Sequence, residues 1–312
     1  MVIAANTVSP TPKISVLLTS FNRENYIAEA IDSVLAQTET DFELVICDDR
    51  SSDGTTDIVR DYARRDARIH LSINERNLGD YANRRHVARL AHGRFLKYHD
   101  SDDVMYSHCL KTMVEPLEAE PRAAFAMTGP RNWPGGPCPM LLTPRLAYER
   151  ELLGSGLFQQ GPASAMFRAE AFEALGGFPE VDIAGDFLFW LHACAKVNVL
   201  LVPGDLFYYR IHPGQEMAKP ESEMAYARAT AEAWRLLQSG QCPLDGETLE
   251  IGKRNFAFVQ ARAVYRHLKG GRVGSALMLL RHAGLSPADW ISYVRPPRRN
   301  PNAGTPAVEE PN

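Results

Sequence analysis

The sequence predicts an α/β fold, with a mixed, mostly parallel sheet flanked by helices and a helical C-terminal extension. Two observations lead to this prediction. Over the first hundred residues, compact apolar runs alternate with segments of helical periodicity. This β-α-β rhythm is typical of a parallel sheet with right-handed crossovers. Over residues 221–285, in contrast, the apolar positions recur mainly with helical spacing.

The first half contains four predicted strands and three predicted helices. The strands are short apolar runs rich in β-branched and aromatic residues, which is typical of buried strands. The helices have apolar residues three and four positions apart, as at Ile27, Ile31, Val34 and Leu35. The predicted strands cover 13–20, 42–49, 68–74 and 94–100, and the predicted helices cover 22–38, 51–66 and 81–93.

The second half is less regular. A Pro/Gly-rich loop is expected at 130–140. Segment 162–180 predicts a strand, a short helix and a Gly-Gly turn, and segment 184–196 predicts an apolar helix with a polar start. Segment 197–215 predicts one or two short strands followed by a basic stretch. We therefore expect a disordered N-terminus (1–12), an α/β domain (13–215), a helical extension (216–290) and a disordered tail (291–312).

Composition excludes several classes of protein. The chain has 312 residues, 45% of them hydrophobic and 23% charged, and a net charge of −4, so we expect no nucleic-acid partner. Its five cysteines include no CxxC pair, which favours a reducing cytoplasm over a disulfide framework. There is no secretory signal and no apolar run of about 20 residues. We expect a cytoplasmic protein that is at most attached to a membrane surface.

Three of the predicted strands end in polar clusters, at 19–23, 48–54 and 100–103. In parallel α/β sheets ligands bind beyond the carboxyl ends of the strands, so these clusters predict one site. There is no G-x-G-x-x-G after the first strand and no P-loop motif, which removes the main support for a dinucleotide fold or a P-loop enzyme.

The most acidic of these clusters holds Asp100, Asp102 and Asp103. Their mutual repulsion must be offset by a divalent cation, by positive side chains or by exposure to water. Mg²⁺ and Mn²⁺ take oxygen ligands and are often held by one or two carboxylates plus phosphates. The alternative is a solvated acidic turn. Likewise, Asp48 and Asp49 can accept hydrogen bonds from a base or ribose, or can belong to a helix cap.

Together these segments resemble family 2 inverting glycosyltransferases, which have the Rossmann-like GT-A fold. The resemblance covers residues 13–215, with the family's motifs in order: "ISVLLTSFNRENYIAEAIDSVLAQTETDFELVICDDRSSDGT", "NLGDYANRRHVARLAHGRFLKYHDSDD", "GPASAMFRAEAFEALGGFPE" and "AGDFLFWLHA". It implies a nucleotide-sugar donor, Mn²⁺ or Mg²⁺ as cofactor, and transfer to a hydroxyl of a glycan or lipid-linked acceptor.

The resemblance also implies roles for single residues. Asp186 matches the general base, and Asp102 with Asp100 matches the metal-binding acids. Asp49 matches the residue that reads the nucleotide base. The full set implied to bind the nucleotide-sugar is Thr19, Phe21, Arg23, Asp49, Arg84, Asp100, Ser101, Arg210 and His212.

Two residues depart from the family's pattern. Arg85 stands where an Asn is usual after the arginine, and Gly185 stands where a Glu usually precedes the catalytic Asp. Gly185 puts the acceptor specificity in question more than the chemistry. The QxxRW motif of processive synthases is missing, which favours transfer of a single sugar. Trp133, in the Pro/Gly-rich loop, is a weak candidate for acceptor contact.

We therefore expect a metal-dependent inverting transferase of surface polysaccharide biosynthesis. A UDP-sugar is the expected donor, although dTDP- and GDP-sugars fit the same residues. Two alternatives stay open at this point: a nucleotidyltransferase that makes the sugar nucleotide, and a non-catalytic binding module. The basic helices at 254–284 are expected to pack against the α/β domain, to form a homodimer contact, or to lie on an anionic membrane at the inner face of the plasma membrane.

Overall fold

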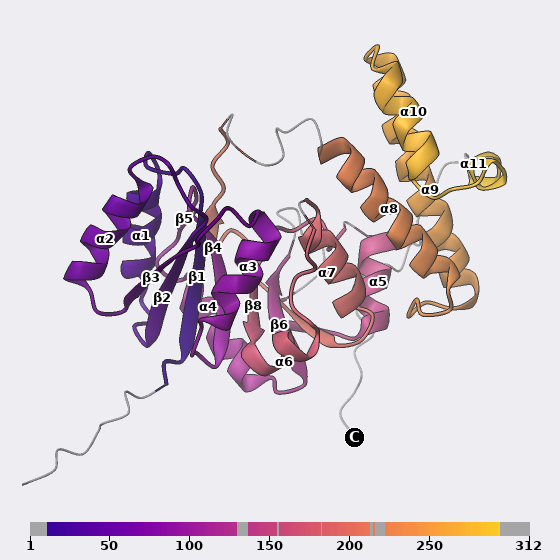
Figure 1. Cartoon of the computed structure of the whole chain (residues 1–312). Coiled ribbons are helices and arrows are strands. Elements are labelled where there is room, and N and C mark those ends of the chain that lie inside the picture. Colours follow the sequence, from indigo (N-terminus) through magenta and orange to yellow (C-terminus); the bar gives the residue numbers. More distant parts are fainter. Residues whose placement is uncertain are drawn as a thin grey trace, which may run out of the picture.

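The computed structural model describes residues 11–129, 137–154, 156–181, 183–212, 215 and 222–293. Trp133 and most of the two segments predicted to be disordered lie outside these residues. The described chain forms an eight-stranded sheet in the order β3-β2-β1-β4-β8-β6-β9-β7, with helices on both faces (Figure 1). The predicted α/β fold with a mixed, mostly parallel sheet is confirmed.

The first half of the sheet is wholly parallel. Strands β1 and β2 are buried over their full length, as their continuous apolar sequences predict. The strands are β1 (Ile14–Ser20), β2 (Phe42–Asp48), β3 (Ile69–Ile73) and β4 (Phe95–Asp100). The helices between them are α1 (Ile27–Leu35), α2 (Thr55–Arg65) and α3 (Asp80–Arg89).

Helix α1 begins five residues later than predicted, because residues 22–26 form a turn. Asn22 has a φ of 53°, and its backbone N–H donates to Ser51 Oγ. The N–H of Arg23 donates to Thr55 Oγ1 at 2.8 Å. These bonds to the loop after β2 keep Arg23 out of the helix and at the edge of the sheet.

The second half of the sheet is mixed. Strand β8 is antiparallel to both β4 and β6, β6 is parallel to β9, and β7 is antiparallel to β9. These strands are β6 (Ala123–Thr128), β7 (Met140–Leu142), β8 (Ala165–Arg168) and β9 (Asn198–Val202). The helices here are α4 (Cys109–Ala119), α5 (Pro144–Leu153), α6 (Ala169–Ala174) and α7 (Gly185–Ala193).

A separate two-stranded ribbon determines where the late part of the chain runs. Strand β10 (Phe207–Tyr208) pairs antiparallel with β5 (Val104–Met105), directly after the acidic cluster. It therefore carries residues 209–212 back over the carboxyl end of β4.

Two apolar clusters fill the two faces of the sheet. Helices α1, α2 and α4 cover one face, which includes Val16 and Leu18, and helices α3, α6 and α7 cover the other, which includes Leu17. The second cluster is rich in aromatic rings. Phe189 and Trp190 lie within it, edge-on and stacked on Phe167 respectively, and are core residues.

The C-terminal extension is helical, as predicted: α8 (Ser222–Gln238), α9 (Gly246–Lys269), α10 (Val273–His282) and α11 (Pro287–Tyr293). Trp234 of α8 and Ala257 of α9 belong to the same apolar cluster as the sheet. Figure 1 shows α10 projecting at the end of the molecule opposite α2. No helix in the described part of the chain has the length and apolar character that a bilayer crossing requires.

Candidate active site

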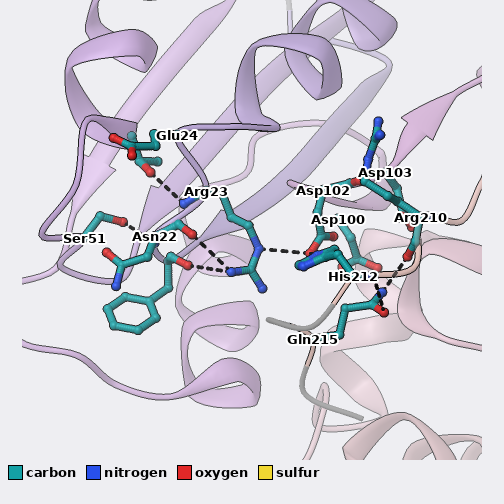
Figure 2. Close-up of polar contacts among 12 residues, drawn as sticks. Asn22, Arg23, Glu24, Ser51, Asp100, Asp102, Asp103, Arg210, His212 and Gln215 are labelled. Atoms are coloured by element: carbon teal, nitrogen blue, oxygen red, sulfur yellow. Dashed lines mark hydrogen bonds and ion pairs between the residues drawn. The ribbon is translucent and has the colours of Figure 1, made fainter. Parts of the chain in front are cut away.

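The polar residues predicted to converge do lie together, at the carboxyl ends of β1, β2 and β4. In the parallel register Thr19 stands opposite Asp100, and Ser20 stands opposite Asp48. The loops that follow these strands, together with residues 209–212, surround this edge (Figure 2).

Asp102 is held between two basic side chains. Arg23 Nε and His212 Nε2 each lie 2.9 Å from its Oδ2 (Figure 2). Arg23 comes from the loop after β1, while His212 comes from the segment after β10, 110 residues beyond Asp102. The imidazole of His212 also packs on the Tyr26 ring, with centroids 4.7 Å apart. The structure thus brings these residues to Asp102, and their binding of the nucleotide-sugar stays a prediction.

Asp100 has its own counter-charge. Arg84 Nη2 donates to Asp100 Oδ1 at 2.7 Å, and Arg84 Nε donates to Asp80 Oδ1 at 2.9 Å. Burial acts to raise the pKa of Asp100, but the Arg84 guanidinium holds it below its usual value. Arg84 Nη1 is buried and has no hydrogen-bond partner among the described residues. Such an N–H group is a donor for an anionic ligand.

Asp103 is the acid that the sequence left without a role. Its side chain is buried, and Oδ1 accepts the backbone N–H of Arg210 at 3.0 Å. Burial, reinforced by the charge of Asp100, raises the pKa of Asp103 to about 8, so at neutral pH the protonated form dominates. Arg210 also donates from Nε to the Asp102 carbonyl and from Nη2 to Glu29. Positive partners and a protonated carboxyl thus offset the repulsion within the cluster.

Three residues predicted to bind the nucleotide line the same edge. Phe21 is exposed, with its ring free to stack on a base, whereas Thr19 and Ser101 are buried. Asp49 is buried too, and its carboxylate accepts from Asn74 Nδ2 and from the N–H groups of Leu78 and Gly79. In this structure Asp49 therefore anchors the loop before α3, and its reading of the base stays a prediction.

Asp186 lies in the first turn of α7, and its Oδ1 accepts the N–H of Phe187 at 2.8 Å. Burial raises the pKa of Asp186, while the Phe187 N–H, the Tyr81 side chain and the Arg84 charge partly counteract that rise. The Arg84 charge thus favours the ionised form of both Asp186 and Asp100.

The two departures from the family pattern have structural consequences. A Cβ on Gly185 would lie 2.6 Å from Tyr81 Cδ1, so the Tyr81 ring of α3 fills the space that a side chain there would need. Arg85 forms an ion pair with Glu180 at 3.3 Å. The sequence reading missed Tyr81, because an aromatic residue in a helix carries no signal of what it packs against.

A cavity of about 890 Å³ was also missed. It lies between α7, the segment before α7, and α8, with an apolar floor that includes Leu188, Phe189 and Ala229. On the same helix α8, burial and then the nearby Asp186 charge raise the pKa of Tyr226 to about 12.

The described residues contain no group of three or more His, Cys, Asp or Glu side chains that could hold a metal ion. The site fits Mn²⁺ or Mg²⁺ only as a partial ligand set, with Asp102 as the leading carboxylate and substrate phosphates supplying further oxygens. Both carboxylates already have basic partners, Arg84 at Asp100 and Arg23 with His212 at Asp102.

Comparisons with known proteins identify the class. In fold the chain is similar to Staphylococcus aureus TarS in complex with UDP-GlcNAc (TM-score 0.61, 22% identity, covering 82% of this chain and 73% of that one). It is also similar to the mannosyltransferase PcManGT of Pyrobaculum calidifontis in complex with GDP-Man and Mn²⁺ (TM-score 0.59, 18% identity, covering 91% and 83%). Fold and site thus define a glycosyltransferase with the GT-A fold.

The family follows from the sequence match. The profile described as Glycosyl transferase family 2 matches residues 15–176, and the chain belongs to that family. The resemblance found in the sequence is confirmed, and membership of this family argues against the nucleotidyltransferase.

Two curated relatives show the range of the family. The putative teichuronic acid biosynthesis glycosyltransferase TuaG of Bacillus subtilis is 37% identical over 118 residues, covering 38% of this chain and 46% of the relative. The UDP-Glc:alpha-D-GlcNAc-diphosphoundecaprenol beta-1,3-glucosyltransferase WfgD of Escherichia coli is 38% identical over 104 residues, covering 33% and 40%. These alignments span less than half the length of either relative.

Proposed function

We propose that this glycosyltransferase is metal-dependent and inverting, and that it transfers a single sugar from a UDP-sugar to a hydroxyl of a glycan or lipid-linked acceptor in surface polysaccharide biosynthesis. The observation that carries the proposal is the arrangement around Arg84. This buried cation is bonded to Asp100, has one N–H group without a partner among the described residues, and its charge acts to lower the pKa of Asp186 as well. The UDP-GlcNAc bound by the TarS structure supports the choice of donor.

The leaving group sets the first chemical requirement. A nucleoside diphosphate leaves readily only when its growing negative charge is neutralised. Arg84 Nη1 is a buried donor for it, and Arg23 and His212 are basic side chains at the same edge. When bound at Asp102, Mn²⁺ or Mg²⁺ would supply further charge neutralisation. The Mn²⁺ in the complex of the archaeal neighbour supports this cofactor.

The acceptor sets the second requirement. Its hydroxyl must lose a proton as it attacks the anomeric carbon, and Asp186 is the carboxylate placed to accept that proton. Burial raises the pKa of Asp186, which makes the ionised form a stronger base. A single displacement of this kind inverts the anomeric configuration.

The proposed place of action follows from the acceptor. The diphosphoundecaprenol-linked acceptor in the name of the E. coli relative supports a lipid-linked glycan, and with it a position in the cytoplasm at the inner face of the plasma membrane. The predicted homodimer has no support among the contacts of the single chain and stays a prediction.

The test separates binding from chemistry. We expect UDP with Mn²⁺ to raise the unfolding temperature of the wild type, and we expect EDTA or Asp102→Ala to weaken that rise. Asp57→Ala is the matched control, because Asp57 is an exposed carboxylate on α2 that pairs only with Arg60.

Turnover is then measured with UDP-sugars and a lipid-linked acceptor. We expect Asp186→Asn to keep the UDP-dependent shift and to lose at least about a hundredfold in kcat, as removal of a general base does. If EDTA leaves the shift unchanged, the metal dependence is wrong. If Asp186→Asn turns over at the wild-type rate, the assignment of the base is wrong.

A further inference from the structure

Most of helix α9 and all of helix α10 lie in a stretch that carries basic side chains and no acidic ones. Residues 251–288 include seven Lys or Arg residues and no Asp or Glu. Subtracting these seven from the 34 basic residues of the chain leaves 27 against 38 acidic ones, a net charge of −11 for the rest. The seven are Lys253, Arg254, Arg262, Arg266, Lys269, Arg272 and Arg281.

Most of these charges are not neutralised locally. Lys253 pairs with Glu250 and Arg272 approaches Glu223, but the other five form no ion pair within the described chain. All five are exposed. The field at this end of the molecule is therefore positive and faces solvent.

The same helices expose large apolar side chains. Of the thirteen large hydrophobic residues exposed in the described chain, seven lie on α9, α10 and α11. They are Val259, Tyr265, Leu268, Val273, Leu277, Leu280 and Ile291. An apolar surface of this extent that is left open to water marks an interaction site.

The two kinds of side chain are interleaved. On α10, Val273, Leu277 and Leu280 are spaced i, i+4 and i+7, so they share one exposed face, and Ala276 is the buried residue of the helix. Around the Gly270–Gly271 turn, Leu268 and Lys269 stand close in sequence to Arg272 and Val273. Figure 1 shows this α9–α10 hairpin projecting from the end of the molecule. Exposed aliphatic groups among cations are typical of helices that lie in the interface of an anionic bilayer.

We propose that the α9–α10 hairpin docks on an anionic lipid surface, with the face of Val273, Leu277 and Leu280 entering the interface and the surrounding Arg and Lys residues contacting lipid phosphates. The inference deepens the proposed function, because it supplies the means by which the enzyme would reach a lipid-linked acceptor. Charge argues against a second copy as the occupant. A two-fold dimer through this face would bring two mainly positive surfaces together.

Vesicle flotation of the full chain tests the proposal. We expect binding to vesicles of phosphatidylcholine mixed with phosphatidylglycerol, and little binding to phosphatidylcholine alone. Salt well above about 0.1 M should weaken the binding, because it screens the attraction. Each cation at such a surface contributes about fivefold in affinity, so Arg266→Glu with Lys269→Glu should lower binding at least about tenfold. Leu277→Ser with Leu280→Ser should lower it as well.

The matched control is Arg60→Glu with Arg64→Glu on α2, which makes the same change in net charge at the opposite end of the molecule. The UDP-dependent thermal shift shows that each variant is folded. Equal binding to neutral and anionic vesicles, or an equal loss in the α2 control, would overturn the proposal. So would a wild-type dimer that Leu277→Ser with Leu280→Ser converts to a monomer while vesicle binding persists. Absence of the UDP shift in the wild type would count against the proposed function only.

Discussion

Tyr81 is the residue whose contacts say most about the candidate base. Its ring is buried against Gly185, and its side chain lies beside the Asp186 carboxylate. Burial raises the pKa of Asp186, and the hydrogen bond from Tyr81 opposes that rise by favouring the ionised form. Burial also raises the pKa of Tyr81 itself well above its usual value, so the hydroxyl stays protonated as a donor.

This balance predicts a change in pH dependence. An ionised base makes kcat rise as pH rises through the pKa of Asp186. Tyr81→Phe removes a hydrogen bond to the ionised form, so that pKa should increase, and the rising limb of kcat against pH should move to higher pH. At high pH the two enzymes should converge.

The control for this experiment is Tyr148→Phe, because the Tyr148 hydroxyl donates to the Leu191 carbonyl away from the site. In Tyr148→Phe the rising limb of kcat against pH should lie at the same pH as in the wild type. If the rising limb of kcat against pH does not move in Tyr81→Phe, or if kcat falls by the same factor at every pH, the role given to Tyr81 is wrong.

At the scale of elements, α3 and α7 meet at a contact that permits no side chain on Gly185. A Cβ there would lie 2.6–2.8 Å from three atoms of the Tyr81 ring. Real Cβ atoms do not approach that closely, so either α7 or the ring must shift. Because Asp186 follows Gly185 directly, the position of the candidate base depends on this helix contact.

Gly185→Ala should therefore lower the free energy of unfolding by about 1–3 kcal/mol, the usual cost of overpacking. Urea unfolding measures it, with Gly274→Ala as the control, since no atom lies within 4 Å of a Cβ built at Gly274. In the double variant with Tyr81→Ala the effect of Gly185→Ala should largely vanish, because the two residues are in contact. Additive effects would mean that the clash is not the cause.

The elements also show what the sequence can predict. The alternating first half was predicted almost completely, because its apolar runs and helical periodicities are local patterns. The ribbon of β5 with β10 was not, since two-residue strands have no periodicity and their pairing joins segments about a hundred residues apart. Resemblance to a family supplied Arg23, Asp102 and His212, and the structure brings them together. It did not supply Tyr81, because its role depends on burial.

On the scale of the whole molecule, the α/β domain and the C-terminal helices share one apolar cluster. Trp234 is 1% exposed and lies in that cluster with Leu191 of α7 and Tyr148 of α5. The boundary predicted at residue 215 stays a prediction, but the packing implies that the two parts unfold together.

Trp234→Ala should lower the free energy of unfolding by about 3–5 kcal/mol, as deletion of a large buried aromatic side chain does. If the two parts unfold as one unit, the UDP-stabilised transition moves by the same amount as the transition without ligand. Trp290→Ala, on the outer helix α11 and only half-buried, is the matched control and should cost less. If Trp234→Ala leaves the UDP-sensitive unfolding transition unchanged, the C-terminal helices fold independently of the α/β domain.

The β5–β10 ribbon has a consequence for how the length of this chain can vary. The backbone N–H of Arg210 donates to the Asp103 carboxylate, and its side chain donates to the Asp102 carbonyl. These two bonds fix the segment that follows β10 against the acidic cluster. One residue inserted after Tyr208 would advance the chain by about 3.3 Å and turn each following side chain to the opposite side. His212 would then leave Asp102. Family members that keep this histidine should accordingly tolerate insertions and deletions elsewhere, and keep a constant number of residues between the ribbon and the imidazole.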